Sequence, residues 1–174
     1  MKNKIRQFII AAVILLTVLC LVFIFGNSLK DSTESGEQSR AVKEMLTAIA
    51  DLFGIEGNIN IAILRNLAHV AEFALLGLCI GLLTFYLARR KCPVSWIRYT
   101  LFTLASVGVG VLIAILDELI QLGSLGRACE IKDVLLDTVG IIIGNAFAIF
   151  TYLLVVKIKE VREKARKEKF SKNT

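Results

Sequence analysis

Four apolar runs, each long enough to cross a lipid bilayer, constrain this chain more than any other feature. They cover residues 8–26, 66–88, 100–122 and 134–156. A helix crosses a hydrocarbon core of about 30 Å with about 20 apolar residues, and no run shows the alternation of a membrane β-strand. The hydrophobic content is 56%, above the roughly 45–50% of soluble domains. We predict an all-α integral membrane protein: a four-transmembrane-helix bundle forming one domain over residues 1–174.

Basic residues indicate how these helices are oriented. Lysine and arginine precede the first run, separate the second from the third, and dominate a tail over residues 157–174. Cytoplasmic segments of membrane proteins carry such an excess. The 27–60 loop has more acidic than basic residues and is predicted to face outward. We predict a multi-pass cell-membrane protein with both termini cytoplasmic. We attribute the net charge of +6 to this topology and predict no nucleic-acid partner.

The first run also resembles a signal peptide, because basic residues precede it. No A-x-A cleavage pattern follows it, so an uncleaved anchor is predicted.

The outer loop becomes amphipathic over residues 38–53, with Val42, Met45, Leu46, Ile49 and Leu52 at helical spacing. This pattern predicts a short helix on the outer surface. Its apolar stripe could contact the membrane surface or the bundle, and we favour the bundle.

Polar residues interrupt the apolar runs at one end only. Counting helix rise from the inner edge places Glu72 and Asp117 each about 24 Å along their helices, and His69 and Asp137 each about 28 Å. Three helices thus deliver these groups to one layer near the outer face. An ionisable group costs about 2.5–3.5 kcal/mol at the centre of a membrane helix. A layer that keeps several is therefore predicted to be the working site.

Residue spacing indicates which of these groups share a face. His69 and Glu72 are three apart and Asp117 and Gln121 four apart, so each pair projects from one side of its helix. Adjacent Asp117 and Glu118 point about 100° apart, so we expect one to meet an arginine and the other the pocket. The candidates for catalysis are His69, Glu72 and Asp117. The candidates for ligand binding are Arg65, Glu118, Gln121, Arg127, Asp133 and Asp137.

Three kinds of chemistry suit this layer. A histidine beside carboxylates can move protons, or the same groups can bind a divalent cation. Two arginines can grip a phosphate or carboxylate. The chain has no HExxH, no zinc-finger spacing and no Ser-His-Asp pattern, and its four cysteines stand apart from one another. The residues alone assign neither a reaction nor a metal nor another cofactor.

Two motifs in this layer carry a family resemblance. Residues 65–77, RNLAHVAEFALLG, are similar to the pattern R-K-x-x-H-x-x-E-(Y/F)-x-x-L-G. Residues 117–121, DELIQ, precede Gly126-Arg127, then Asp133, Gly140 and Gly144. Together they resemble the VanZ-like family, named for the teicoplanin-resistance protein of glycopeptide-resistant bacteria. Asn66 stands where the family often has lysine, and Asp137 where it usually has asparagine.

The resemblance implies a cell-envelope membrane protein linked to teicoplanin-type antibiotic resistance, without naming a reaction. An outward-facing layer suits a lipid-linked cell-wall precursor or a membrane-anchored lipoglycopeptide, besides the lipid bilayer itself. One alternative is a small transporter or proton-coupled unit, which the absence of carboxylates and histidines from the inner halves of the runs disfavours. Another is a structural or assembly protein in which the layer only fixes helix register.

Overall fold

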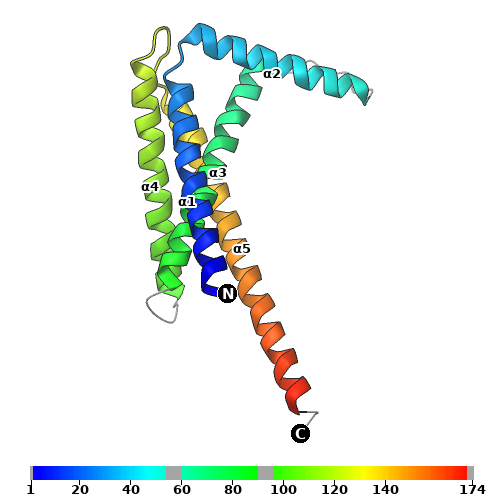
Figure 1. The fold of residues 1–174 in the computed structure, drawn as a ribbon. Coiled ribbons are helices and arrows are strands. Elements are labelled where there is room, and N and C mark those ends of the chain that lie inside the picture. Colours follow the sequence, from blue (N-terminus) through cyan, green and yellow to red (C-terminus); the bar gives the residue numbers. More distant parts are fainter. Residues whose placement is uncertain (1, 54–59, 90–95, 172–174) are drawn as a thin grey trace.

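Of the five helices in the described residues, the four long ones that could span a membrane run alongside one another. The other helix lies across one end of the bundle (Figure 1). The computed structural model describes residues 2–53, 60–89 and 96–171. The helices in these residues are α1 (Lys2–Ser28), α2 (Ser32–Leu52), α3 (Ile61–Arg89), α4 (Trp96–Leu122) and α5 (Ile131–Ser171). All except α2 are long and apolar enough to cross a membrane. The predicted all-helical bundle with four candidate spans is confirmed.

Each long helix extends beyond its apolar run. α1 begins at Lys2 and α3 at Ile61, several residues before the apolar runs that mark them. α5 continues to Ser171 through a segment rich in lysine, glutamate and arginine, which are strong helix formers. α1 begins and α5 ends at the end of the bundle opposite α2 (Figure 1).

The crossing helix α2 begins earlier than the amphipathic pattern predicted. The Asp31 side chain caps it by accepting hydrogen bonds from the backbone N–H groups of Thr33 and Glu34, each at 2.8 Å. None of its residues is buried, and Met45 and Leu52 are 56% and 84% exposed. The stripe meets the bundle only near its start, where Val42 lines a pocket together with residues of α3, so the expectation that the whole stripe packs against the bundle is wrong. α2 projects beyond α3 (Figure 1), and most of the rest of the stripe is exposed.

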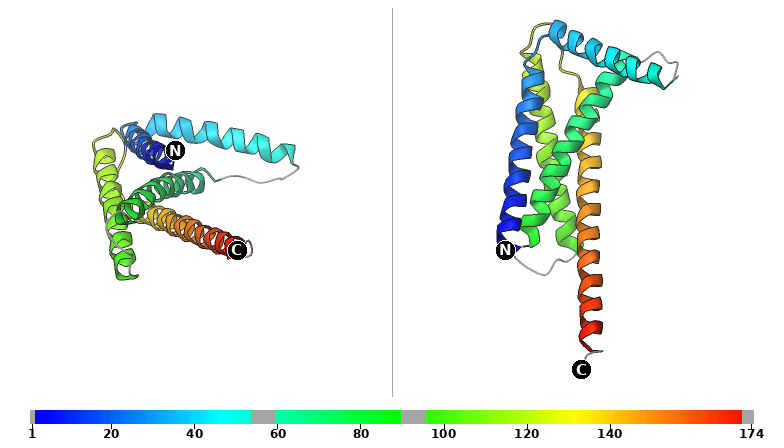
Figure 2. Two further views of the ribbon diagram at one scale, coloured as in Figure 1. Left: turned by 60° about the horizontal axis from the view of Figure 1, so that its bottom comes forward. Right: turned by 45° about the vertical axis from the view of Figure 1, so that its right-hand side comes forward.

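Glycines lie in the most extensive helix contact of the bundle, between α3 and α5, where Figure 2 shows the two helices crossing. A Cβ atom added at Gly77 would lie 2.5 Å from the carbonyl oxygen of Ile141. Added at Gly144, it would meet the carbonyl oxygen of Ala74. Small residues allow such backbone approach between membrane helices. This contact fixes the relative position of the polar groups that the two helices carry.

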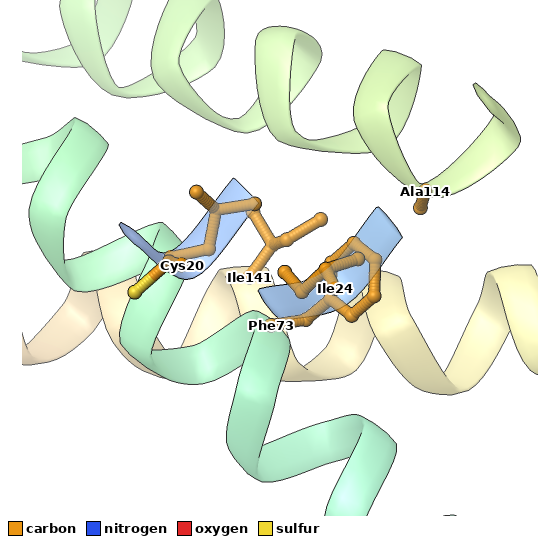
Figure 3. Packing of buried hydrophobic residues seen from close by; sticks show 6 residues of the cluster. Cys20, Ile24, Phe73, Ala114 and Ile141 are labelled. Atoms are coloured by element: carbon orange, nitrogen blue, oxygen red, sulfur yellow. The ribbon is translucent and has the colours of Figure 1, made fainter. Parts of the chain in front are cut away.

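A hydrophobic cluster fills the bundle below the polar layer. Four helices contribute to it, as Figure 3 shows for the labelled side chains. Its buried members are Cys20, Ile24, Phe73, Leu76, Ala114 and Ile141. Towards the other end of the bundle, the rings of Phe85, Tyr99 and Tyr152 pack together, with centroids 5.5–5.9 Å apart. Mainly apolar and aromatic side chains therefore lie between the polar layer and the opposite end, with one buried polar pair, Ser106 and Asn145, among them.

Candidate functional site

Asp117 lies at the centre of the polar layer and joins two helices. Its carboxylate is buried, and it accepts a hydrogen bond from the Ser28 hydroxyl at the end of α1. Gln121, one turn further along α4, donates to the other carboxylate oxygen at 2.8 Å. These two donors fix the orientation of the carboxylate, because a rotation would break both bonds.

His69 and Asp137 face each other across the contact between α3 and α5. The Nδ1 atom of His69 lies 3.3 Å from Oδ1 of Asp137. Asp137 is fully buried, and neither of its carboxylate oxygens has a hydrogen-bond partner among the described residues. One ligand-capable atom each from His69, Asp117 and Asp137 lies within 4.8 Å of the other two. The predicted convergence of these three groups is thus observed.

Glu118 points away from this group and holds the start of α5. Its buried carboxylate accepts the backbone N–H of Glu130 at 2.9 Å. Over the described residues, neither Glu118 nor Asp117 forms an ion pair with Arg65 or Arg127. We expected one of the two acids to meet an arginine, and this is incorrect. The N–H groups at the start of a helix lack intrahelical hydrogen-bond acceptors. The Glu118 carboxylate supplies an acceptor at the start of α5.

A pocket of about 120 Å³ opens above the layer, beneath the first half of α2. Six of the predicted site residues line it: Arg65, His69, Glu72, Asp117, Gln121 and Arg127. The α2 side of the lining consists of Ser35, Gln38, Ser39 and Val42. Asp137 lies outside the lining, behind His69, while Asp133 is half-buried on α5 and also outside it. The pocket lining therefore combines two arginines with a floor formed by the side chains of His69 and Asp117.

The two arginines hold different positions in the lining. Arg65 is exposed, whereas Arg127 is half-buried and donates from Nη1 to the carbonyl oxygen of Asn27 at 3.0 Å. The Nε atom of Arg127 is buried without a hydrogen-bond partner among the described residues. Burial, and after it the charge of Arg65, lowers the pKa of Arg127. A guanidinium nevertheless stays charged at neutral pH, so Arg127 has donor capacity to spare.

The loop between α4 and α5 closes one side of the pocket. Ser124 donates from its hydroxyl to the carbonyl oxygen of Ser28 at 2.8 Å, and the N–H of Ser32 donates to the carbonyl of Leu125 at 3.1 Å. Gly126 has a positive φ of 72°, in the region that favours glycine. These bonds attach the segment that carries Arg127 to the junction of α1 and α2.

Sequence reasoning left several polar partners out of the site. Asn27 and Ser28 directly follow the first apolar run, and that position was the available signal for both. Asn145 is buried two turns beyond Asp137 on α5 and accepts a hydrogen bond from Ser106 of α4 at 2.7 Å. A lone asparagine within an apolar run was the signal for this second, deeper polar pair.

The chain matches a known protein family over most of its length. A family model described as VanZ/LLP1 matches residues 12–155. The chain belongs to the VanZ/LLP1 family. No curated protein and no solved structure matches it.

The VanZ/LLP1 match contains every candidate site residue and all four candidate spans in large part. Membership in this family together with four such helices identifies a multi-pass membrane protein. Within this VanZ/LLP1 chain, the paired arginines suit an anion. His69 with two aspartates suits proton transfer or cation binding.

Proposed function

We propose that this protein binds the anionic head group of a lipid or lipid-linked molecule at the outer face of the cell membrane. Through this binding it contributes to tolerance of teicoplanin-type lipoglycopeptides. The observation that carries the proposal is the pair Arg65 and Arg127 in one pocket. The charge of Arg65 disfavours the protonated state of Arg127. An anion bound between them relieves this repulsion and engages the unused donors of Arg127.

The position and lining of the pocket favour a lipid-linked ligand. Ile24, Val42 and Leu64 line it beside the polar groups, so apolar surface adjoins the anion-binding donors. The cavity volume of about 120 Å³ suits a group of phosphate size, with the rest of the ligand outside. The neighbouring apolar stripe of α2 is suited to lie on a lipid surface, which would bring lipid close to the entrance.

A transport role receives less support. Ile24 both lines the pocket and belongs to the buried hydrophobic cluster. The pocket thus ends on packed apolar side chains, whereas a polar path would have to continue past them. Proton transfer by His69 with Glu72 or Asp117 remains compatible with a catalytic version of the proposed role, in which the bound head group is also modified.

Antibiotic susceptibility tests the proposal. A sensitive Gram-positive host would express wild type, Arg127→Gln, Arg65→Gln or the control Arg40→Gln at equal membrane levels. Arg40 is exposed on α2 and outside the pocket lining. We expect wild type and Arg40→Gln to raise the inhibitory concentration of teicoplanin, and both pocket variants to lose this increase. Wild-type protein without effect, or Arg127→Gln acting as wild type, would contradict the proposal.

The outward orientation of the pocket has its own test. Cys129 is exposed in the loop beside Arg127, whereas Cys20 and Cys79 are buried. A membrane-impermeant thiol reagent added to intact cells should therefore label wild type, and Cys129→Ser should lose that label. Labelling of Cys129 only after the cells are broken would place the pocket on the cytoplasmic side and refute the orientation.

A further inference from the structure

The contact between His69 and Asp137 has the distance of an ion pair but not the geometry of a hydrogen bond. The two atoms are 3.3 Å apart, yet both carboxylate oxygens of Asp137 and Nδ1 of His69 are buried without a hydrogen bond among the described residues. A buried carboxylate is strongly disfavoured unless a positive charge compensates it, which either a protonated His69 or a bound cation would do. Asp137 has no exposed surface through which water could reach it. An imidazole nitrogen and carboxylate oxygens held in this way are atoms that suit a divalent cation.

The separation of these atoms matches two ligands of one metal ion. Nitrogen and oxygen ligands lie about 2.0–2.2 Å from Zn²⁺ in a tetrahedral site, which places two such ligands about 3.3–3.6 Å from each other. A carboxylate oxygen of Asp117 is the third atom of the group, and all three lie within 4.8 Å. The donors of Ser28 and Gln121 orient that carboxylate. Such supporting hydrogen bonds are typical of metal ligands.

We propose that His69, Asp117 and Asp137 bind one divalent transition-metal ion at the floor of the pocket. One imidazole and two carboxylates form a mixed set that suits Zn²⁺ or Mn²⁺ better than Mg²⁺, which prefers oxygen ligands and retains water. The ion supplies two positive charges beside Asp117 and Asp137, which form no ion pair with an arginine over the described residues. It also accounts for the orphaned oxygens of Asp137.

Three protein ligands leave a coordination position open. His69 and Asp117 both line the pocket, so this position faces the cavity. An anionic oxygen of a head group could occupy it, alongside Arg65 and Arg127. That last step rests on the proposed function, whereas binding of the ion itself does not.

Metal binding to the purified, detergent-solubilised full chain tests the proposal without any lipid ligand. After chelator treatment, titration calorimetry with Zn²⁺ and with Mn²⁺ would be run on wild type, Asp137→Asn, His69→Gln and the control Glu130→Gln. The Glu130 side chain is exposed near the start of α5. We expect one ion per chain for wild type and the control. Both ligand variants should weaken binding by more than about 100-fold, beyond the usual effect of losing a supporting partner.

Thermal unfolding provides a second readout that folding defects do not imitate. The bound ion should raise the melting temperature of wild type and of Glu130→Gln, but not of either ligand variant. If Asp137→Asn fails to fold, His69→Gln still decides the question. Wild type that binds neither ion, or ligand variants that bind as tightly as wild type, would overturn the proposal. Neither result would alter the arginine-dependent susceptibility expected above, so the two proposals fail separately.

Discussion

The close contact of α3 and α5 predicts that alanine at Gly144 is destabilising although alanine is the better helix former. A Cβ atom there would overlap the carbonyl oxygen of Ala74 and lie 2.5 Å from the backbone nitrogen of Leu78. Both are backbone atoms, which cannot rotate away as a side chain does. Gly108 on α4 offers a matched control, because a Cβ atom there meets nothing within 4 Å.

The two substitutions gain the same helix propensity, but only Gly144→Ala introduces a steric overlap that lowers the free energy of unfolding. Replacing glycine by alanine within a helix favours folding by up to about 1 kcal/mol. Overpacking a tight contact costs about 1–3 kcal/mol, occasionally more. Because helix propensity cancels in the comparison, Gly144→Ala should be less stable than Gly108→Ala by about 1–3 kcal/mol. Gly108→Ala itself should be as stable as wild type or slightly more so.

Unfolding by sodium dodecyl sulfate in mixed micelles, followed by circular dichroism, measures these differences as shifts of the midpoint. The two variants and wild type would be compared at equal protein and detergent concentrations. Equal midpoints for Gly144→Ala and Gly108→Ala would refute the reasoning. That result would mean that α3 and α5 do not approach closely at this glycine, and that His69 and Asp137 are not held together by it.

Three further changes test the supports of the site. Asp31→Ala removes the cap of α2 and should cost about 1 kcal/mol, seen as faster amide hydrogen exchange in its first turn; unchanged exchange would argue against the cap. Gly126→Ala should lower the melting temperature, since a positive φ costs other residues about 1–2 kcal/mol and the new Cβ would lie 2.5 Å from the Ser32 hydroxyl oxygen. An unchanged melting temperature would contradict this. Alanine substitutions at Ser106 and Asn145, singly and together, should give a coupling energy of about 0.6 kcal/mol, at most about 1.7, from their hydrogen bond; no coupling would show that the pair does not interact.

Counting along the helices was sufficient to predict which groups share a level. His69, Asp117 and Asp137 were placed in one layer from helix rise alone, and the structure brings their ligand atoms within 4.8 Å of one another. The calculation works because spans in a membrane begin at a common plane and rise by a constant amount per residue. Their chemical role, and the orientation across the membrane, stay predictions.

The direction in which each side chain points was harder to predict from the sequence. Asp117 and Glu118 were expected to diverge, but nothing local indicated that Glu118 would bind the N–H of Glu130. The roof of the pocket was also not predictable, because an amphipathic stripe does not specify its partner. Ser28 entered the site only through the packing of α1 against α4.

The sequence by itself determined the number of spans, their helical form and the level of the polar layer. It could do so because, in a bilayer, every backbone polar group of a spanning helix must form its hydrogen bond within that helix. Charged residues are costly and therefore rare in such helices, so each one in an apolar run is informative. Only the tertiary structure decided that α2 covers the pocket, that glycines hold His69 against Asp137, and that both Asp137 oxygens lack a hydrogen-bond partner among the described residues. Those facts depend on which helix faces lie against each other, and that is set by packing among all the helices at once.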